Sequence, residues 1–502
     1  MRTLIWHGWL LEGSGSNVAA ARLSEVLRAS GHDVLLVCQE GHPERYPWID
    51  ASGTAGAGGV SDLRPNPGAS TGPGRCVLLR PEIGRLLPVF VVDEYDGFDV
   101  KAFVDLTEEE LDAYLERNVE ALRAAAGWHR PEVVLAGHAV PGPAIARRAL
   151  GPGTYVARIH GSDLEYAVRQ QERYRALAAE GLGAARAVTG ATTESLERCV
   201  ELVPEARGIV RVIRPGVSDH AFHPMPRRRA LLDVASRLEA DRGTARGRPI
   251  SLDAEVERAL IDRDADELDR LAATYDQDVP DPDAAARLRE LAELERPLVG
   301  YIGKFIPQKG VELLLAGAHL ARTEVDVLIV GFGSHRERLE ALARSLSSGD
   351  TAALDWLGEN AGMRFESARG RRPGVAFTGR LDHRYAPGAL AAMDVLVVPS
   401  VLAEAFGIVA AEGAAAGALP LVARHSGLAE VAAELEGEVG RPGLFSFEPG
   451  PGAARSVAAG IDRLLSLPRA ERDELRSRVS AFVAREWTWE RTAAGLLEAA
   501  TA

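Results

Sequence analysis

An alternation of short apolar runs with helix-patterned segments, which occurs twice along the chain, constrains the fold most. TLIWHGW, the glycine loop LLEGSGSN, the helix-patterned VAAARLSEVLRASG and the apolar HDVLLVC follow one another near the start. This is the order of a βαβ unit. A second series runs from RPLVGYIGKF through EVDVLIVGFGS to DVLVVPS. Alternating strands and helices predict parallel sheets, so we expect an α/β protein with two such domains.

The length of 502 residues also favours two cores over one. Between residues 225 and 296 the pattern changes to charged, helix-patterned segments without a buried-strand signal, which we interpret as a helical insertion. Residues 50–75 are rich in Gly, Ala, Pro and Ser and are predicted to form a flexible surface loop. The predicted order is an α/β domain over residues 1–213, an interdomain linker 214–224, the insertion 225–296 and a second α/β domain 297–480.

Composition and charge exclude several classes of protein. The formal net charge is −14 and there is no basic tail, which argues against a nucleic-acid partner. Cys38, Cys76 and Cys199 lack the spacing of metal ligands and fit a reduced, cytoplasmic compartment. TLIWHGWLL is interpreted as a first strand, and no segment approaches the ~20 apolar residues that cross a bilayer. We therefore expect a cytoplasmic protein without a transmembrane segment.

The stretch EAFGIVAAE places Glu404 before a predicted helix and Glu412 one turn inside it. The helix begins near Gly407 and Ile408, and its first amides have no partners within the helix. Such a helix start favours an anion like a diphosphate, and acceptor-only carboxylates suit the hydroxyls of a sugar or a ribose. The alternative is that both glutamates are ordinary helix residues. A charge in an otherwise apolar helix favours the binding interpretation.

Lysine usage points to a second element of this site. Only Lys101, Lys304 and Lys309 occur among 58 basic residues, and two of the three lie in GKFIPQKG after the first strand of the second domain. In a parallel sheet this loop can lie beside EAFGIV, so both ammonium groups could neutralise one diphosphate. The alternative is two surface lysines, which is less favoured in a chain with so few.

Together these stretches resemble the family 4 retaining glycosyltransferases of the GT-B fold. The resemblance covers nearly the whole chain, and its most specific element is the E-x7-E motif with its flanks. The matching stretches are GSGS, IHGSD (159–163), VIRPGVSDHAFHP (212–224), YIGKFIPQKG, VAFTGRL (375–381), MDVLVVPS and EAFGIVAAE. The resemblance implies two Rossmann-like domains that face a cleft. It also implies that a C-terminal helix, residues 481–502, packs back on the N-terminal domain.

The resemblance implies roles for residues of the second, donor-binding domain. Glu404 would hold hydroxyls of the donor sugar and Glu412 the ribose, while Lys304 and Lys309 grip the diphosphate. Lysine stands at 304, where many relatives carry arginine; the charge is kept. The remaining implied donor contacts are Gly15, Gly379, Arg380, Leu381, Phe406, Gly407 and Ile408, with the nucleobase near residues 379–381.

In the first domain the resemblance implies that His160 hydrogen-bonds the donor sugar near the reacting carbon. Asp163 is expected to orient this loop as a helix cap or supporting acceptor. His138, in AGHAVPG, is a weaker candidate for a structural or acceptor-side role, and Ser14 and Gly15 of the glycine loop are assigned to the acceptor side. A strand-end histidine without a catalytic role is the alternative for His160.

These assignments predict a hexosyltransferase that acts with retention of configuration, with His160, Lys304, Lys309 and Glu404 as catalytic residues. No bound cofactor and no metal site are expected, because no paired-aspartate motif follows a strand. The co-substrate is a UDP-, GDP- or ADP-sugar, and the acceptor is a glycan, a lipid or a small metabolite. A nucleotide-sugar epimerase and a non-catalytic sugar-nucleotide-binding protein are the alternatives. The oligomeric state and the role of the insertion are not predicted.

Overall fold

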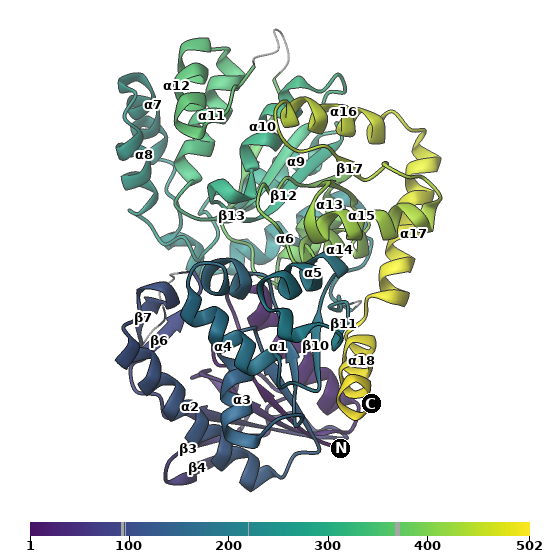
Figure 1. Cartoon of the computed structure of the whole chain (residues 1–502). Helices are drawn as coiled ribbons and strands as arrows, with labels where there is room; N and C mark the ends of the chain where they lie inside the picture. Colours follow the sequence, from purple (N-terminus) through teal and green to yellow (C-terminus); the bar gives the residue numbers. More distant parts are fainter. Residues whose placement is uncertain (92–94, 96, 219, 367–371) are drawn as a thin grey trace. The chain divides into compact units, whose positions relative to one another are not determined.

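The computed structural model of the chain describes residues 1–91, 95, 97–218, 220–366 and 372–502. The chain divides into two compact units (Figure 1): unit 1 comprises Met1–Gly216 with Trp487–Ala502, and unit 2 comprises Val217–Glu486. The division falls within the predicted linker 214–224, of which residue 219 lies outside the described residues. At the other end it falls at residue 486, not 480, because a helix of unit 2 runs to Glu486.

Unit 1 is built on a sheet of nine strands in the order β11-β10-β9-β8-β1-β2-β5-β3-β4. Neighbouring strands are parallel except for the β3–β4 pair. A separate parallel pair is formed by β6 (Leu86–Val89) and β7 (Asp99–Ala102). The sheet strands are β1 (Arg2–Trp6), β2 (Asp33–Val37), β3 (Ala51–Gly56), β4 (Gly59–Pro65), β5 (Arg75–Pro81), β8 (Val133–Gly137), β9 (Val156–Arg158), β10 (Ala187–Gly190) and β11 (Val210–Val212).

Helices cover both faces of this sheet and form two apolar clusters. One cluster takes side chains from α2 (Glu108–His129), α3 (Gly142–Leu150), α4 (Glu172–Leu182) and α5 (Thr193–Leu202). The other takes them from α1 (Gly15–Ala29) and the C-terminal α18 (Trp489–Thr501). α18 joins unit 1 tightly, because a Cβ on Gly216 would lie 2.5 Å from the Thr488 carbonyl carbon and closer still to the Trp489 nitrogen. The last helix is therefore part of this unit's core.

The prediction of a flexible loop over residues 50–75 is wrong. β3 and β4 form an antiparallel pair at the edge of the sheet, and β5 begins at Arg75. The small residues serve close packing: a Cβ on Gly53 would lie 2.7 Å from the carbonyl oxygen of Ser61. β4 is mostly exposed and carries Asp62 and Arg64, as is usual for an edge strand. A glycine- and serine-rich composition therefore does not by itself indicate disorder.

Unit 2 contains a fully parallel sheet in the order β14-β13-β12-β15-β16-β17. Its strands are β12 (Leu298–Lys304), β13 (Asp326–Phe332), β14 (Val375–Phe377), β15 (Val395–Val398), β16 (Leu419–Ala423) and β17 (Ser446–Phe447). The helices of this series are α10 (Val311–Leu320), α11 (Arg336–Ser348), α12 (Thr351–Ala361), α13 (Ala386–Ala392), α14 (Ile408–Ala415), α15 (Ser426–Val439), α16 (Ala453–Leu465) and α17 (Arg469–Glu486).

The segment 225–296 is helical, and it belongs to unit 2. Its helices are α6 (Arg227–Ala240), α7 (Leu252–Asp262), α8 (Ala265–Ala272) and α9 (Ala284–Glu293). α6 packs against α9 and α13, and α7 and α8 pack against α11. Each presents buried apolar side chains such as Val234, Val256 and Leu268. The insertion therefore shares the core of unit 2.

Among the helices in the parts of the chain that the structure describes, none combines the length and apolarity needed to cross a membrane.

Candidate functional site

Two loops at the carboxyl ends of neighbouring strands lie side by side in unit 2. β12 pairs with β15, so the loop that carries both lysines runs beside the loop that precedes α14. The Val401 amide donates a hydrogen bond to the Gln308 carbonyl at 2.9 Å. Gly310 (φ 63°) passes so close to the Pro399 carbonyl that a Cβ would collide with it. Parallel pairing thus brings together motifs that lie about 95 residues apart in the sequence.

Lys309 and Glu404 form an ion pair across these loops. The Ser400 hydroxyl donates a second hydrogen bond to Glu404, at 2.7 Å. Burial by itself would raise the pKa of Glu404, but the Lys309 ammonium group and the Ser400 hydroxyl hold this pKa below its usual value. Glu404 is therefore a carboxylate at neutral pH, with an ammonium group beside it. The resemblance implies that Glu404 contacts the donor sugar and Lys309 the diphosphate. In the structure these two side chains also form an ion pair with each other.

The start of α14 is shaped by backbone geometry. Gly407 is the N-cap residue with φ 85°, a left-handed conformation that glycine adopts without strain, and no side chain caps the helix. The preceding loop is fixed because the Glu404 amide donates to the Ser426 hydroxyl at 2.9 Å and the Gly427 amide donates to the Glu404 carbonyl at 2.9 Å. The first amides of α14 lack intrahelical acceptors and can bind an anion.

The other predicted residues of this stretch differ in exposure. Phe406 is 3% exposed and is a packing residue, while Ile408 lies half-buried at the first position of α14. Glu412 is half-buried one turn further, in a helix whose other residues are apolar or glycine. Glu404 and Glu412 therefore flank the helix start from its two sides along the chain.

Lys304 and the predicted nucleobase loop share a neighbour, the Phe332 ring. The Lys304 ammonium nitrogen lies 5.5 Å from the ring centroid, and the Arg380 guanidinium carbon lies 4.8 Å from it. Gly379 is left-handed (φ 69°), and Leu381 is 5% exposed. The lysine loop and the loop 379–381 therefore meet around one aromatic side chain.

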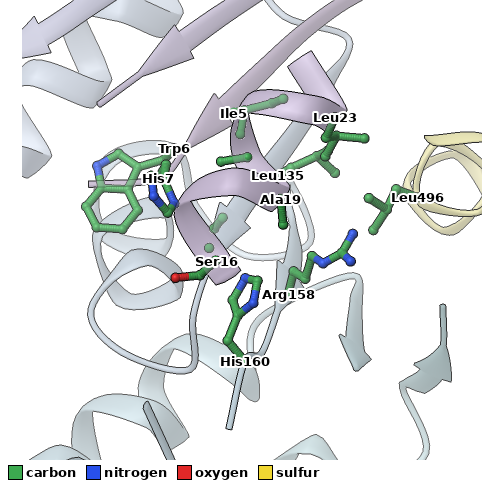
Figure 2. Close-up of a pocket in the computed structure, with 13 residues that line it drawn as sticks. Ile5, Trp6, His7, Ser16, Ala19, Leu23, Leu135, Arg158, His160 and Leu496 are labelled. Atoms are coloured by element: carbon green, nitrogen blue, oxygen red, sulfur yellow. The ribbon is translucent and has the colours of Figure 1, made fainter. Parts of the chain in front are cut away.

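In unit 1, His160 lines a pocket at the carboxyl end of the sheet (Figure 2). Its neighbours include His7, Ser16 and Arg158, over an apolar floor that includes Leu135 and Leu496. Burial lowers the pKa of His160 well below its usual value, and the charges of Arg158 and His7 act in the same direction. The imidazole is therefore neutral at pH 7 and can accept a hydrogen bond at one nitrogen.

His138 and Asp163 support the His160 loop. The His138 ring is 1% exposed and lies 4.6 Å from the ring of His160 and 4.4 Å from that of Trp9. Asp163 is fully buried, and its carboxylate accepts hydrogen bonds from the amides of Ala139 (2.6 Å), His160 (3.1 Å) and Leu164 (2.9 Å). The Asp163 carboxylate therefore accepts hydrogen bonds from the backbone of two loops and holds them together, which is what a supporting acceptor would do.

Ser14 and Gly15 begin helix α1. The Ser14 hydroxyl accepts a hydrogen bond from the Asn17 amide at 3.3 Å and is the N-cap. Gly15 is the first helical residue, and a Cβ there would meet open space. Gly15 belongs to unit 1, whereas the other predicted donor-binding residues all belong to unit 2.

Several side chains that contribute to these sites were not predicted from the sequence. Ser400 follows the strand-patterned DVLVVP, so its place at a strand end was the available signal; the contact with Glu404 follows from the fold. His7, Arg158 and Phe332 carry no distinguishing motif. Among the residues with described positions, no group of three His, Cys, Asp or Glu side chains is arranged to hold a metal ion.

Residues 296–466 match the family model "Glycosyl transferases group 1". This range includes both lysines, the loop 379–381 and the whole of EAFGIVAAE. The GDP-mannose-dependent alpha-(1-6)-phosphatidylinositol monomannoside mannosyltransferase of Mycobacterium tuberculosis is 28% identical over 233 residues, which cover 44% of this chain and 51% of that protein. The alpha-D-kanosaminyltransferase of Streptomyces kanamyceticus is 32% identical over 155 residues, 30% of this chain and 34% of that protein. The chain thus spans about a third to a half of the length of these curated relatives.

Solved structures match over the whole chain. Sucrose-phosphate synthase from Thermosynechococcus elongatus superposes with a TM-score of 0.58 at 18% identity, covering 99% of this chain and 97% of that one. Anabaena HepE in complex with UDP and glucose superposes with a TM-score of 0.57 at 14% identity, covering 99% and 98%. At these identities the likeness shows the fold alone, so the chain has the GT-B fold, and its residues 296–466 are similar to the group 1 glycosyl transferases.

Proposed function

We propose that the protein is a retaining hexosyltransferase that moves a sugar from a nucleoside diphosphate to an acceptor hydroxyl without a bound metal ion. The observation that carries this proposal is the Lys309–Glu404 pair at the uncapped start of α14. A carboxylate and an ammonium group held together beside free helix amides suit a ligand with both hydroxyls and a diphosphate.

On the donor side, Lys304, Lys309 and the first amides of α14 would neutralise the diphosphate. Negative charge develops on this group as it leaves, so fixed positive groups stabilise the transition state more than the ground state. Glu404 would accept hydrogen bonds from the sugar hydroxyls, and Glu412 from the ribose. Lys309 would then orient Glu404 as well as bind phosphate.

Unit 1 would bind the acceptor, with its glycine loop among the contacts. His160 is proposed to hydrogen-bond a hydroxyl of the donor sugar through its neutral ring, positioned by Asp163 through the His160 amide. The predicted donor contact of Gly15 stays part of this proposal.

The reaction exchanges one bond at the anomeric carbon for another. The bond from this carbon to the diphosphate oxygen breaks, and the acceptor oxygen bonds to the same carbon on the same face. The acceptor proton passes to the departing diphosphate, so charge balances without a covalent enzyme intermediate. This course is the one that the family resemblance implies.

Relatives support the class of donor. The names of the mycobacterial relatives specify GDP-mannose, and solved structures of HepE contain UDP and UDP-glucose. For this chain the base and the sugar are open among UDP-, GDP- and ADP-sugars, and the acceptor among glycans, lipids and small metabolites.

The test is calorimetric titration with UDP, GDP and ADP, followed by turnover of the matching sugar conjugates. We expect one series to bind, and Lys309→Ala to lower kcat/KM on the order of 100-fold, because it removes a charge that faces the leaving group. Lys101→Ala is the matched control, since Lys101 lies in unit 1 and pairs with Glu110. Glu412→Ala should weaken nucleotide binding with little effect on kcat.

The outcomes separate this proposal from its alternatives. Binding without turnover of any donor would indicate a sugar-nucleotide-binding protein, and release of free nucleotide diphosphate together with a rearranged sugar would indicate an epimerase. Product of inverted configuration by NMR would refute retention. Loss of activity in EDTA that a divalent cation restores would refute metal independence.

A further inference from the structure

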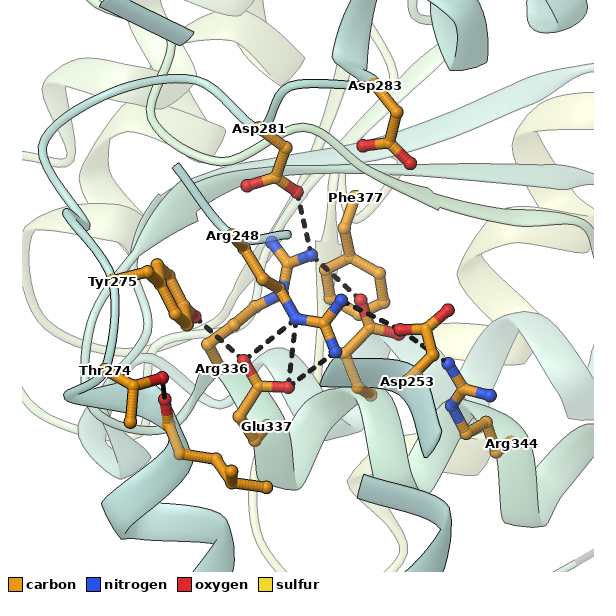
Figure 3. A network of polar contacts seen from close by, with 12 residues as sticks. Arg248, Asp253, Thr274, Tyr275, Asp281, Asp283, Arg336, Glu337, Arg344 and Phe377 are labelled. Atoms are coloured by element: carbon orange, nitrogen blue, oxygen red, sulfur yellow. Dashed lines mark hydrogen bonds and ion pairs between the residues drawn. The ribbon is translucent and has the colours of Figure 1, made fainter. Parts of the chain in front are cut away.

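Between α8 and α9, the helical insertion contains a stretch without helix, residues 275–281, that a buried ionic network holds against the rest of unit 2 (Figure 3). Arg248 of the insertion, 1% exposed, donates to Glu337 at 2.9 Å, and Glu337 is fully buried. The Tyr275 hydroxyl donates to the same carboxylate at 2.8 Å. A buried guanidinium and carboxylate with this many hydrogen bonds fix the geometry of the segment that joins them.

The same stretch pairs with the loop predicted to lie near the nucleobase. The Asp281 amide donates to the Thr378 carbonyl at 2.8 Å, and Pro280 forms an antiparallel bridge with Gly379. A Cβ on Gly379 would lie 2.6 Å from the Asp281 carboxylate and 3.0 Å from the Val279 carbonyl oxygen. Glycine at 379 is therefore required by the close approach of the insertion as well as by its left-handed φ.

A pocket opens between this stretch and the end of β13. The insertion supplies one wall, and the glycine-flanked turn 331–333 with Gly379 supplies the other. The cavity between them measures only about 10 Å³, so a larger ligand would lie across its mouth. Gln277, Val279 and Asp281 line the pocket from the insertion, and Phe332 and Arg336 line it from the other side.

Charge is already balanced at Arg336, which lines this pocket, and at Arg380, which follows the lining residue Gly379 in the chain. Arg336 donates to Asp281 at 3.0 Å and to Glu340 at 2.8 Å, and Arg380 pairs with Asp278 at 2.5 Å. Both cations therefore have carboxylate partners, which disfavours a phosphate here. A flat, neutral ring with hydrogen-bonding edges suits the mouth of a pocket that has glycine backbone on one side and amphipathic side chains on the other.

The position of the pocket relative to the lysine loop also favours a neutral ring, namely the base of a nucleotide. The Phe332 ring lines the pocket and also contacts the Lys304 ammonium group and the Arg380 guanidinium group. A nucleotide whose diphosphate lies at the lysines can thus extend past Phe332 to the mouth of the pocket.

We propose that residues 275–281 of the insertion form the base-selecting wall for the donor nucleotide, with Gln277 and Val279 as the side chains that read the base. This inference rests on the proposed function. The insertion is accordingly a specificity element built into the donor unit.

The test compares three variants by their Kd for UDP, GDP and ADP. Val279→Trp adds bulk at the mouth of the pocket, so we expect the affinity for the preferred nucleotide to fall at least about tenfold. Gln277→Ala removes one reading side chain without adding bulk, and should change the ratio of the three Kd values by about threefold or more. Lys309→Ala, which acts on the shared diphosphate, should weaken all three nucleotides by a similar factor.

Ile261→Trp is the matched control, because Ile261 is 73% exposed on α7 of the same insertion and does not line the pocket. If no nucleoside diphosphate binds the unaltered protein, the proposed function fails. If one binds and Lys309→Ala weakens it, but Gln277→Ala and a folded Val279→Trp leave the Kd values and their ratios unchanged, this inference alone is overturned. Should Val279→Trp not fold, the Kd ratios of Gln277→Ala decide the matter.

Discussion

The polar groups of the two units are stabilised in different ways. In unit 2, buried or half-buried charges face opposite charges: Lys309 faces Glu404, Arg248 faces Glu337 and Arg336 faces Asp281. In unit 1, the residues around the His160 loop are neutral imidazoles, the Arg158 guanidinium and one carboxylate that the backbone satisfies, while ion pairs such as Arg28–Asp50 lie elsewhere in this unit.

The difference matches the chemistry proposed for each unit. A region that binds a diphosphate needs permanent positive charge, and the neighbouring carboxylates keep that charge compensated while no ligand is bound. A region that receives a hydroxyl gains more from neutral groups that can donate or accept a hydrogen bond. Breaking one ionic partner should therefore harm unit 2 severely, whereas pH should act first on unit 1.

The largest effect is expected for Glu337→Gln in unit 2. It removes one of the two carboxylates that pair with the buried Arg248 guanidinium and leaves Asp253, at 2.8 Å, as the other. Removing one partner of a buried pair costs up to about 3–5 kcal/mol of unfolding free energy. Urea denaturation measures the loss. The double variant Arg248→Met/Glu337→Met, which removes both charges, should recover most of the stability. Equal loss in the single and the double variant would show that packing, not charge, is decisive.

Lowering the pH should reduce the stability of the two units to different extents. Burial lowers the pKa of five histidines in unit 1, namely His7, His32, His129, His138 and His160. Below about pH 6.5 these histidines bind protons in the unfolded chain but stay neutral in the folded one. The stability that the neutral imidazoles contribute is therefore fully present above about pH 6.5 and declines as the pH falls. For His7, whose folded pKa is about 4, the contribution is about 3 kcal/mol.

Unit 2 should respond at lower pH. The pKa of Glu404 lies below its usual value of 4.5, so the stability that this carboxylate contributes is present above that value and is lost as the pH falls further. Hydrogen exchange measured by mass spectrometry between pH 7 and pH 4 resolves the units separately. We expect unit 1 to lose protection first, and His7→Gln to reduce that loss. Simultaneous loss of protection in both units would contradict the comparison.

Asp163→Asn should have an intermediate effect in unit 1. The amide side chain keeps one acceptor oxygen but loses the other, so at least one of the amides of Ala139, His160 and Leu164 loses its partner. The expected cost is about 1–3 kcal/mol. Because the His160 amide is among the three, kcat should fall while nucleotide affinity stays the same. A change in nucleotide affinity instead would place Asp163 in a different role.

The smallest effect is expected for Ser400→Ala in unit 2. Glu404 loses one hydrogen bond of 2.7 Å but keeps Lys309, so stability should fall by about 1 kcal/mol. Urea denaturation alongside Lys309→Met tests the ranking. If Ser400→Ala costs more than Lys309→Met, the hydroxyl and not the ion pair holds Glu404.

The sequence by itself determined the class of fold and most of the donor-side candidates. Alternating apolar runs and helix patterns require parallel sheets, whatever their order. The rarity of lysine and the E-x7-E spacing singled out Lys304, Lys309, Glu404 and Glu412 because these features are local. The helical nature of residues 225–296 followed from its pattern in the same way.

The tertiary structure alone decided which of these residues meet. The order β13-β12-β15 brings Lys309 against Glu404 and Ser400, and no local pattern encodes strand order. Composition misled at residues 50–75, where the small residues serve close packing in a strand pair. The place of the insertion beside Gly379 was equally invisible, because it depends on buried ion pairs between residues about 90 positions apart. Periodicity sets local structure, whereas long-range packing and charge compensation set the sites.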